Sequence, residues 1–329
     1  MLARLKGVFD LYIAALFGAV LLATFLPPRG AFAGAVQVAT NIAIVLLFFL
    51  HGARLSREAI LAGAGHARLH LAALGTTFVV FPALGLGLAA LPGITPGTGA
   101  GLLFLTLLPS TVQSSIAFTA IARGNVAAAV CNASFSNLLG IFLTPLLASL
   151  LMGRAGAGGS WDAVENIVLQ LLLPFLAGHL LRPLIGSWVA RHRALVSMVD
   201  RSSILLVVYS AFGAAVVSGL WLDVPLTGLA IILALTCLLL AVVLGFTWWL
   251  GKALGLARED AIVLLFCGSK KSLASGVPIA GVLFPAAQVG LIILPLMVFH
   301  QVQLIVCAAL ARHFAHGADR HAVSRAASD

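Results

Sequence analysis

The sequence has few charged residues, and acidic residues are the scarcest. Only 9% of the 329 residues are charged, and 10 Asp and Glu stand against 19 Lys and Arg, whereas 61% are hydrophobic and the mean hydropathy is +1.13. A soluble domain carries roughly 25% charged residues, so the composition excludes a water-soluble globular protein and a disordered chain. Since a membrane-spanning helix needs about 20 apolar residues, the chain has room for about ten spans.

Cysteine and catalytic motifs are scarce as well. The four cysteines lie in apolar stretches without metal-site spacing, and we interpret them as packing residues: Cys131, Cys237, Cys267 and Cys307. The sequence contains no Gly-rich phosphate loop and no pair of carboxylates at membrane depth. The alternating pattern of membrane strands is also missing. We therefore expect an all-α polytopic membrane protein that is not an enzyme.

Ten apolar segments follow one another along the chain. They cover residues 11–28, 36–53, 69–91, 99–122, 126–152, 164–185, 202–221, 227–250, 260–284 and 287–311. With both termini in the cytoplasm, only Arg29 and Arg154 fall outside and Lys270 and Lys271 fall within the ninth segment, while all other Lys and Arg lie inside. This partition follows the positive-inside rule. We predict an integral protein of a bacterial inner (plasma) membrane with both termini cytoplasmic.

Two segments are interrupted by polar residues, the fourth at 109–115 and the ninth at 267–278. The interruptions lie about half a chain apart, and five segments per half would make the second half inverted relative to the first. Matched interruptions in inverted repeats are the best sequence pointer to the binding site of a secondary transporter. We predict two inverted five-helix repeats whose fourth and ninth helices are broken.

Neutral oxygen ligands gather at the first interruption and in the next segment. The interruption offers Gln113, Ser114 and Ser115, while Asn132 and Ser136 are four residues apart and share a helix face. Hydroxyl and amide oxygens suit a small dehydrated cation or a polar ligand. Hydrogen bonding between helices is the alternative explanation.

The pair Lys270-Lys271 is the most informative feature of the second interruption. A Lys at membrane depth costs at least about 2.5–3.5 kcal/mol on insertion scales, and such residues are functional by default. All ten acidic residues fall at segment ends or in loops. Each amine is therefore uncharged, or bound to backbone carbonyls, or paired with an anionic substrate, unless the pair reaches an interface.

The tenth segment carries a third polar group, His300, Gln301 and Gln303, near its middle. We expect these side chains to face a cavity. An interior histidine that only satisfies its own hydrogen bonds is the alternative. We assign substrate contacts to His300, Gln301 and Lys270.

With its ten segments, its two interruptions and the run Arg123-Gly124-Asn125, the chain resembles the bile acid:sodium symporter family over nearly its whole length. The resemblance implies a four-helix panel and a six-helix core within which the broken helices cross. Residues 1–68 and 161–226 would form the panel, 69–160 and 227–314 the core, and 315–329 a cytoplasmic tail. The run Gly-Ser-Lys-Lys-Ser-Leu is similar to a divergent branch of sodium-dependent transporters.

The resemblance also implies a cation site and a substrate site. The family motif Pro-Gly-Gly-x-x-Ser-Asn falls on 109–115, which implies a sodium ion at Ser114, Ser115, Asn132 and Ser136. The ninth-helix motif Glu-x-x-x-Gln-Asn falls on Cys267, Lys271 and Ser272. The His-Asn pair that lines the family's substrate cavity matches His300-Gln301.

Two departures from that pattern change the expected coupling. Cys267 replaces the Glu that binds sodium, and Lys271 brings a positive charge where a second sodium would sit. Two such charges ~4 Å apart repel by several kcal/mol at an effective dielectric constant of ~20. We expect the Lys271 ammonium to replace a coupling cation, with Ser114, Ser115 and the last carbonyls of the first half-helix as acceptors.

These observations predict a secondary active transporter of an organic anion, bile-acid-like or another amphipathic carboxylate or sulfonate, working by alternating access. Sodium is the expected coupling ion and the only cofactor expected, and nucleic acid is not an expected partner. Proton-linked or uncoupled transport is the alternative within this class. A membrane regulator that transports nothing is the alternative outside it.

Overall fold

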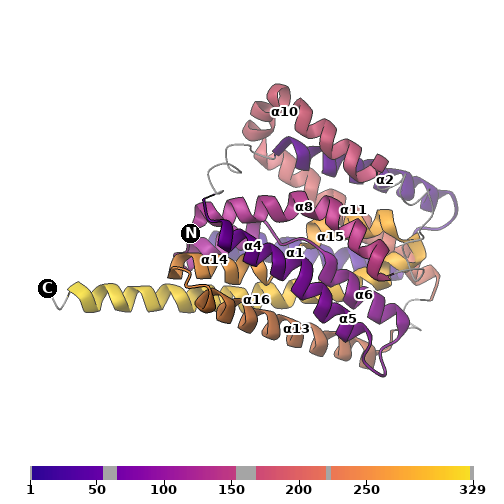
Figure 1. Cartoon of the computed structure of the whole chain (residues 1–329). Coiled ribbons are helices and arrows are strands. Elements are labelled where there is room, and N and C mark those ends of the chain that lie inside the picture. The colour runs from indigo at the N-terminus through magenta and orange to yellow at the C-terminus, as the bar shows by residue number, and fades with distance from the viewer. Residues whose placement is uncertain (1, 55–64, 153–167, 220–223, 327–329) are drawn as a thin grey trace. The chain divides into compact units, whose positions relative to one another are not determined.

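The computed structural model describes residues 2–54, 65–152, 168–219 and 224–326. These residues form helices joined by short turns, and no strand occurs among them (Figure 1). The helices are α1 (Leu2–Phe25), α2 (Gly30–Arg54), α4 (Ala67–Gly75), α5 (Phe81–Ala89), α6 (Pro96–Leu107), α7 (Gln113–Ile121), α8 (Val126–Met152), α10 (Leu173–Arg191), α11 (Arg193–Val217), α13 (Leu226–Ala253), α14 (Arg258–Gly268), α15 (Leu273–Leu283) and α16 (Ala286–Ala326). Two π-helical segments are η1 (Thr76–Val80) and η3 (Val168–Leu172). The all-α prediction is confirmed for this part of the chain.

Membrane-spanning length is reached by eight helical stretches within the described residues. They are Gly30–Arg54, Ala67–Ala89, Val126–Met152, Val168–Arg191, Arg193–Val217, Leu226–Ala253, Arg258–Leu283 and Ala286–Ala315. Shorter apolar helices, Ala14–Phe25 and Pro96–Leu107, occupy the other two predicted segments. The chain is therefore a polytopic membrane protein, while ten spans in two inverted repeats stay a prediction.

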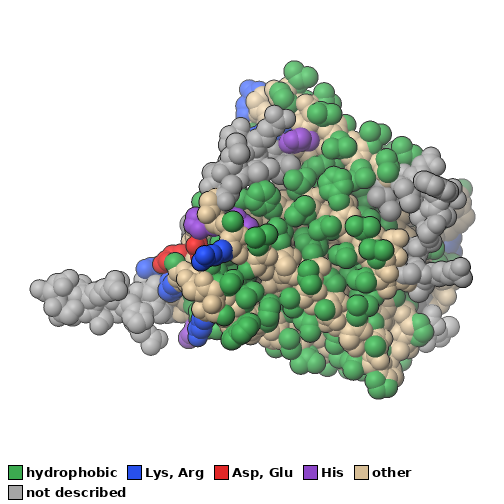
Figure 2. All heavy atoms as spheres, in the orientation of Figure 1, with side chains coloured by type: hydrophobic (Ala, Val, Ile, Leu, Met, Phe, Trp, Pro, Cys, Tyr) green, Lys and Arg blue, Asp and Glu red, His purple; other side chains and the backbone are tan. Residues whose placement is uncertain are grey.

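The outer surface is apolar, as a lipid-facing surface must be. Many large hydrophobic side chains on the surface are exposed over more than a third of their area. Examples are Leu184 (77%), Leu226 (82%) and Ile305 (72%). The face seen in Figure 2 is mostly hydrophobic, and charged side chains gather around the start of α14. A soluble monomer rarely exposes contiguous apolar patches beyond a few hundred Å², so this surface supports membrane insertion.

The chain divides into two compact units. Unit 1 contains Met1–Leu55, Pro145–Leu229 and Ala274–Leu294, and unit 2 contains Ser56–Thr144, Ala230–Leu273 and Pro295–Asp329. The boundaries of these units differ from the panel and core boundaries expected from the sequence, which stay a prediction. The expected boundary at 160/161 falls outside the described residues, as do Arg57 and Arg154 of the charge partition.

Unit 1 is held together by close approach of α2 and α10. A Cβ built on Gly52 would overlap the carbonyl oxygen of Phe175, and a Cβ on Gly178 would overlap that of Phe49. Glycine at both positions lets the two backbones touch, as small residues do between membrane helices.

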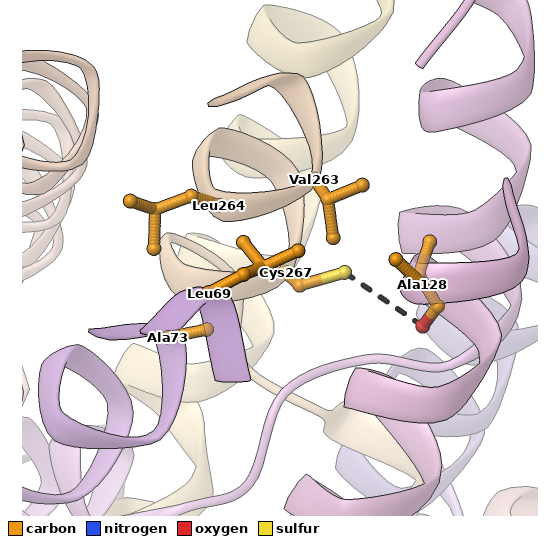
Figure 3. Close-up of a cluster of buried hydrophobic side chains, with 7 residues drawn as sticks. Leu69, Ala73, Ala128, Val263, Leu264 and Cys267 are labelled. Carbon is orange, nitrogen blue, oxygen red and sulfur yellow. Dashed lines mark hydrogen bonds between the residues drawn. The ribbon is translucent and has the colours of Figure 1, made fainter. Parts of the chain in front are cut away.

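Unit 2 contains an apolar cluster that fixes α14 between α4 and α8 (Figure 3). Its buried members are Leu69 and Ala73 of α4, Ala128 and Ala129 of α8, and Val263, Leu264 and Cys267 of α14. The cluster anchors α14 just before the second interruption and thereby positions the lysine pair.

Cysteine packing differs between the buried and exposed positions. Cys131, Cys267 and Cys307 are buried, which agrees with the interpretation as packing residues, whereas Cys237 is exposed.

Candidate functional site

Both interruptions predicted from the sequence are present. α6 ends at Leu107 and α7 begins at Gln113, while α14 ends at Gly268 and α15 begins at Leu273. The first break has a local cause, because the ring of Pro109 disfavours helical geometry in the residue before it. Leu108 is extended, with φ −78° and ψ 155°. Of the break residues, all but Val112 are buried.

The two breaks meet in unit 2. The backbone N–H of Ser272 in the second break donates to the carbonyl of Pro109 in the first, at 2.9 Å. Nearby, the Ser115 hydroxyl at the start of α7 donates to the carbonyl of Phe266 in α14, at 3.0 Å. Two stretches far apart in sequence therefore form one polar region.

Side chains of α8 satisfy the backbone groups freed at the first break. Ser136 Oγ accepts from the backbone N–H of Ser110 at 2.9 Å, and Asn137 Nδ2 donates to the Ser110 carbonyl at 3.0 Å. Thr144 Oγ1 donates to the Leu107 carbonyl at 2.8 Å. Since lipid offers no hydrogen bonds, an unwound segment persists only with such partners.

Lys271 is completely buried and fully hydrogen-bonded. Its Nζ donates to the carbonyl oxygens of Thr77 at 2.8 Å, Thr106 at 2.7 Å and Leu108 at 2.7 Å. The ammonium also lies 4.1 Å from the ring centroid of Phe81. An ammonium has three N–H donors and no acceptor, so the three carbonyls match it. We call Thr77, Thr106 and Leu108 the carbonyl cage.

Each carbonyl of the cage is free for a local reason. Thr106 and Leu108 lie at the C-terminal end of α6, where carbonyls have no partner inside the helix. Thr77 lies in η1, where the N–H of Phe81 donates to Thr76 in the i→i+5 register. The residue in register to donate to Thr77 is then Pro82, which has no N–H.

Lys270 is also fully buried, but its ammonium is poorly matched. Within the described part of the chain, it makes one hydrogen bond, to Ser114 Oγ at 3.2 Å. The rings of Phe118 and Phe266 lie at 4.4 and 5.8 Å from its Nζ. Two of its three N–H groups therefore remain for another acceptor.

No carboxylate neutralises either lysine among the residues that the structure describes. The ion pairs found there join Arg54 to Asp200 and, at 3.6 Å, His66 to Asp260. Both amines therefore lie in a buried polar region in which the described residues provide no acidic partner.

Gln303 of α16 holds the main chain of the second break. Its Oε1 accepts from the Lys271 N–H at 2.9 Å, and its Nε2 donates to the Lys271 carbonyl at 2.9 Å. These two bonds fix which amide atom is nitrogen, so the 2.9 Å contact with His300 Nδ1 is a bond that the histidine accepts. His300 and Gln301 are half-buried.

The side chains expected to bind sodium are bonded to other protein groups, and Ser114 and Ser115 share Thr111 Oγ1 as a partner at 2.9 Å. Ser114 donates to Thr111 Oγ1 at 2.9 Å, and Asn132 Nδ2 contacts His70 Nδ1 at 3.2 Å. Gln113 is exposed. A group of three or more His, Cys, Asp and Glu fit for a metal ion is absent from the described residues.

The remaining expected site residue is Cys267. It lies in the apolar cluster of unit 2, and its thiol makes a long contact, 3.9 Å, with the Ala129 carbonyl (Figure 3).

The expected acceptance by the last carbonyls of the first half-helix is confirmed, because Thr106 and Leu108 bind Lys271. Sequence reasoning missed Thr77 as a partner of Lys271 and His70 as the partner of Asn132. A backbone carbonyl has no side-chain signature, so the partnership with Thr77 left little trace in the sequence. Pro82 inside an apolar segment was the available signal for Thr77.

Comparisons with known proteins place the whole chain. The model of the SBF-like CPA transporter family matches residues 10–316. An uncharacterized protein of Pseudomonas aeruginosa is 54% identical over 328 residues, which cover 99% of this chain and 98% of that protein. The Escherichia coli protein named "Putative symporter YfeH" is 52% identical over 313 residues, 94% of each chain. Sodium/bile acid cotransporter 7 of Mus musculus is 28% identical over 275 residues, 82% of this chain and 81% of that protein. The resemblance to the bile acid:sodium symporter family is confirmed.

Proposed function

The chain belongs to the SBF-like CPA transporter family, and we propose that it is a secondary transporter of an organic anion. The substrate class is an amphipathic carboxylate or sulfonate, and the mechanism is alternating access. The family gives the transporter class. The lysine pair is the reason for proposing that the substrate is negatively charged.

The unmatched ammonium of Lys270 carries this proposal. A buried charge without a counter-charge costs several kcal/mol, and Lys270 has one hydrogen bond at 3.2 Å and no ion pair among the described residues. An anionic substrate would supply both the charge and the acceptors. The buried hydroxyl of Ser110, which has no partner in the described part of the chain, would donate a further hydrogen bond.

The surroundings of Lys270 favour an amphipathic anion. Phe118 and Phe266 flank the ammonium, so an apolar skeleton beside an anionic group would meet aromatic carbon. We propose His300 and Gln301 as further substrate contacts, since both are half-buried and His300 contacts the Gln303 amide.

We propose a cation as the driving ion, with sodium as the first candidate, because the mouse relative is named a sodium/bile acid cotransporter. The oxygens of Ser114, Ser115, Asn132 and Ser136 are the proposed ligands. Sodium-independent transport, proton-linked or uncoupled, is the second candidate, and the matched ammonium of Lys271 favours it. Uptake into proteoliposomes with imposed sodium, potassium or pH gradients separates these candidates.

Binding of taurocholate to the protein in lipid nanodiscs tests the anion proposal. We expect Lys270→Gln to weaken binding roughly tenfold or more, since it removes a charge-assisted hydrogen bond worth about 1.5–3 kcal/mol. Lys252→Gln is the matched control, because Lys252 is exposed on α13. An uncharged bile alcohol should bind wild type and Lys270→Gln alike. If that alcohol binds wild type as tightly as taurocholate does, the anion proposal is wrong.

A further inference from the structure

We propose that the Lys271 ammonium is a built-in monovalent cation, held by the carbonyl cage in a site that would otherwise need a free inorganic cation. The inference deepens the proposed transport function, and its test measures stability rather than transport.

The coordination of Lys271 resembles that of a bare cation. Three carbonyl oxygens approach its Nζ at 2.7–2.8 Å, the short range of charge-assisted hydrogen bonds. Rings of backbone carbonyls are also the ligands that replace the hydration shell of monovalent cations inside membrane channels. The cage therefore has the chemistry of a site for a free cation.

Dipoles rather than charges stabilise this cation. Two oxygens of the cage lie at the C-terminal end of α6, where the helix dipole contributes about −0.5 charge. The ring face of Phe81, 4.1 Å from Nζ, adds a cation–π contact. A carboxylate partner is absent among the described residues, so the cage does not depend on an acidic side chain.

The ammonium cannot leave the cage as a free ion can. The main chain of Lys271 is held by both amide atoms of Gln303, and the N–H of the next residue, Ser272, is bonded to Pro109. The side chain and backbone of Lys271 thus join η1, α6 and α16 in one network. A covalently attached cation keeps these elements together at any concentration of external salt.

Lys270 provides a matched internal comparison. It is equally buried and adjacent in sequence, yet it has one hydrogen bond to a hydroxyl and none to a carbonyl in the described residues. Losing its charge should not leave a set of carbonyls without a donor. The proposal therefore predicts a cation requirement after substitution of Lys271 only.

Thermal unfolding of the purified full-length protein in detergent tests this directly. We expect Lys271→Ala to lower Tm by roughly 5–10 °C, because it leaves three buried carbonyls without a donor. Ammonium or methylammonium ions at millimolar concentration should restore much of that loss in a saturable way. Wild type and Lys270→Ala should show no saturable response to these two ions, with choline chloride as the ionic-strength control. A Lys271→Ala protein that keeps the wild-type Tm, or that none of these cations stabilises, overturns the proposal.

A second variant decides the matter if Lys271→Ala does not fold. Lys271→Met fills nearly the same volume without a donor, so the proposal predicts a clear loss of Tm, and a Tm equal to wild type overturns it. Taurocholate binding plays no part in these measurements. If the anion proposal fails, the built-in cation proposal is therefore unaffected. If the built-in cation proposal fails, the anion proposal is likewise unaffected.

Discussion

At the scale of single residues, two neighbouring lysines differ in how their hydrogen bonds are satisfied. Lys271 donates to three carbonyls, whereas Lys270 donates to one hydroxyl in the described residues. Both are completely buried, so burial alone does not distinguish them. The number of acceptors does, because an ammonium with unmatched donors gains most from an arriving anion.

Substitution of Gln303 tests the hydrogen bonds that hold the main chain of Lys271. Gln303→Ala removes the acceptor of the buried Lys271 N–H and one donor to the Lys271 carbonyl, and an unpaired buried group costs about 1–3 kcal/mol. We expect a loss of roughly 2 kcal/mol in the free energy of unfolding, measured as a lower Tm in detergent. Gln301→Ala, its half-buried neighbour on α16, should change Tm little but weaken taurocholate binding. Equal effects of the two substitutions on Tm would contradict the role given to Gln303.

At the scale of elements, the π-helical segment η1 joins α4 to α5 and provides one backbone carbonyl of the site. It shifts hydrogen bonding from i→i+4 to i→i+5, and Pro82 then leaves the Thr77 carbonyl without a main-chain donor. Segments of this kind recur at functional sites, since they release backbone groups. Here the released group binds Lys271.

A double-mutant cycle between Pro82 and Lys271 tests this link. Pro82→Ala restores an N–H that competes with the Lys271 ammonium for the Thr77 carbonyl. We expect Pro82→Ala to stabilise the Lys271→Ala protein more than it stabilises wild type, with a coupling free energy of about 1 kcal/mol. If the two substitutions change the free energy of unfolding additively, the missing N–H of Pro82 does not contribute to binding of Lys271 at Thr77.

At the scale of the whole molecule, the chain is a polytopic membrane protein of a transporter family. Eight helical stretches of the described residues reach spanning length, and two shorter apolar helices lie in the other two predicted segments, so that ten spans stay a prediction. Apolar side chains cover its exposed helices. The sidedness of the loops is a matter of charge distribution, which the sequence alone predicts.

Cysteine labelling checks that sidedness. In a Cys237→Ser background, cysteines introduced at Gly156 and Asp223, which lie outside the described residues, should react with an impermeant maleimide from the periplasmic side. A cysteine at His192, between α10 and α11, should react only from the cytoplasmic side. Labelling of 156 or 223 from the cytoplasm would contradict the ten-span topology and the inverted repeat together.

Composition and local sequence patterns determined the membrane insertion of the chain and the positions of its two helix breaks. Membrane insertion follows from apolar content, and the first break follows from Pro109, because a proline acts on its immediate neighbour. The second break and the buried lysines could be predicted from polar residues in an apolar run. The motifs on these segments also carried the resemblance to the bile acid:sodium symporter family.

Only the tertiary structure decided which groups meet. Ser114 and Ser115 were expected to bind Lys271, and that prediction was wrong, since Ser114 binds Lys270 and Ser115 binds the Phe266 carbonyl. The carbonyls of the first half-helix were expected correctly, but the share of Thr77 was not foreseen. The physical reason is that every residue carries a carbonyl. Which ones are free depends on where helices end, and which ones converge depends on packing across more than 160 residues of chain.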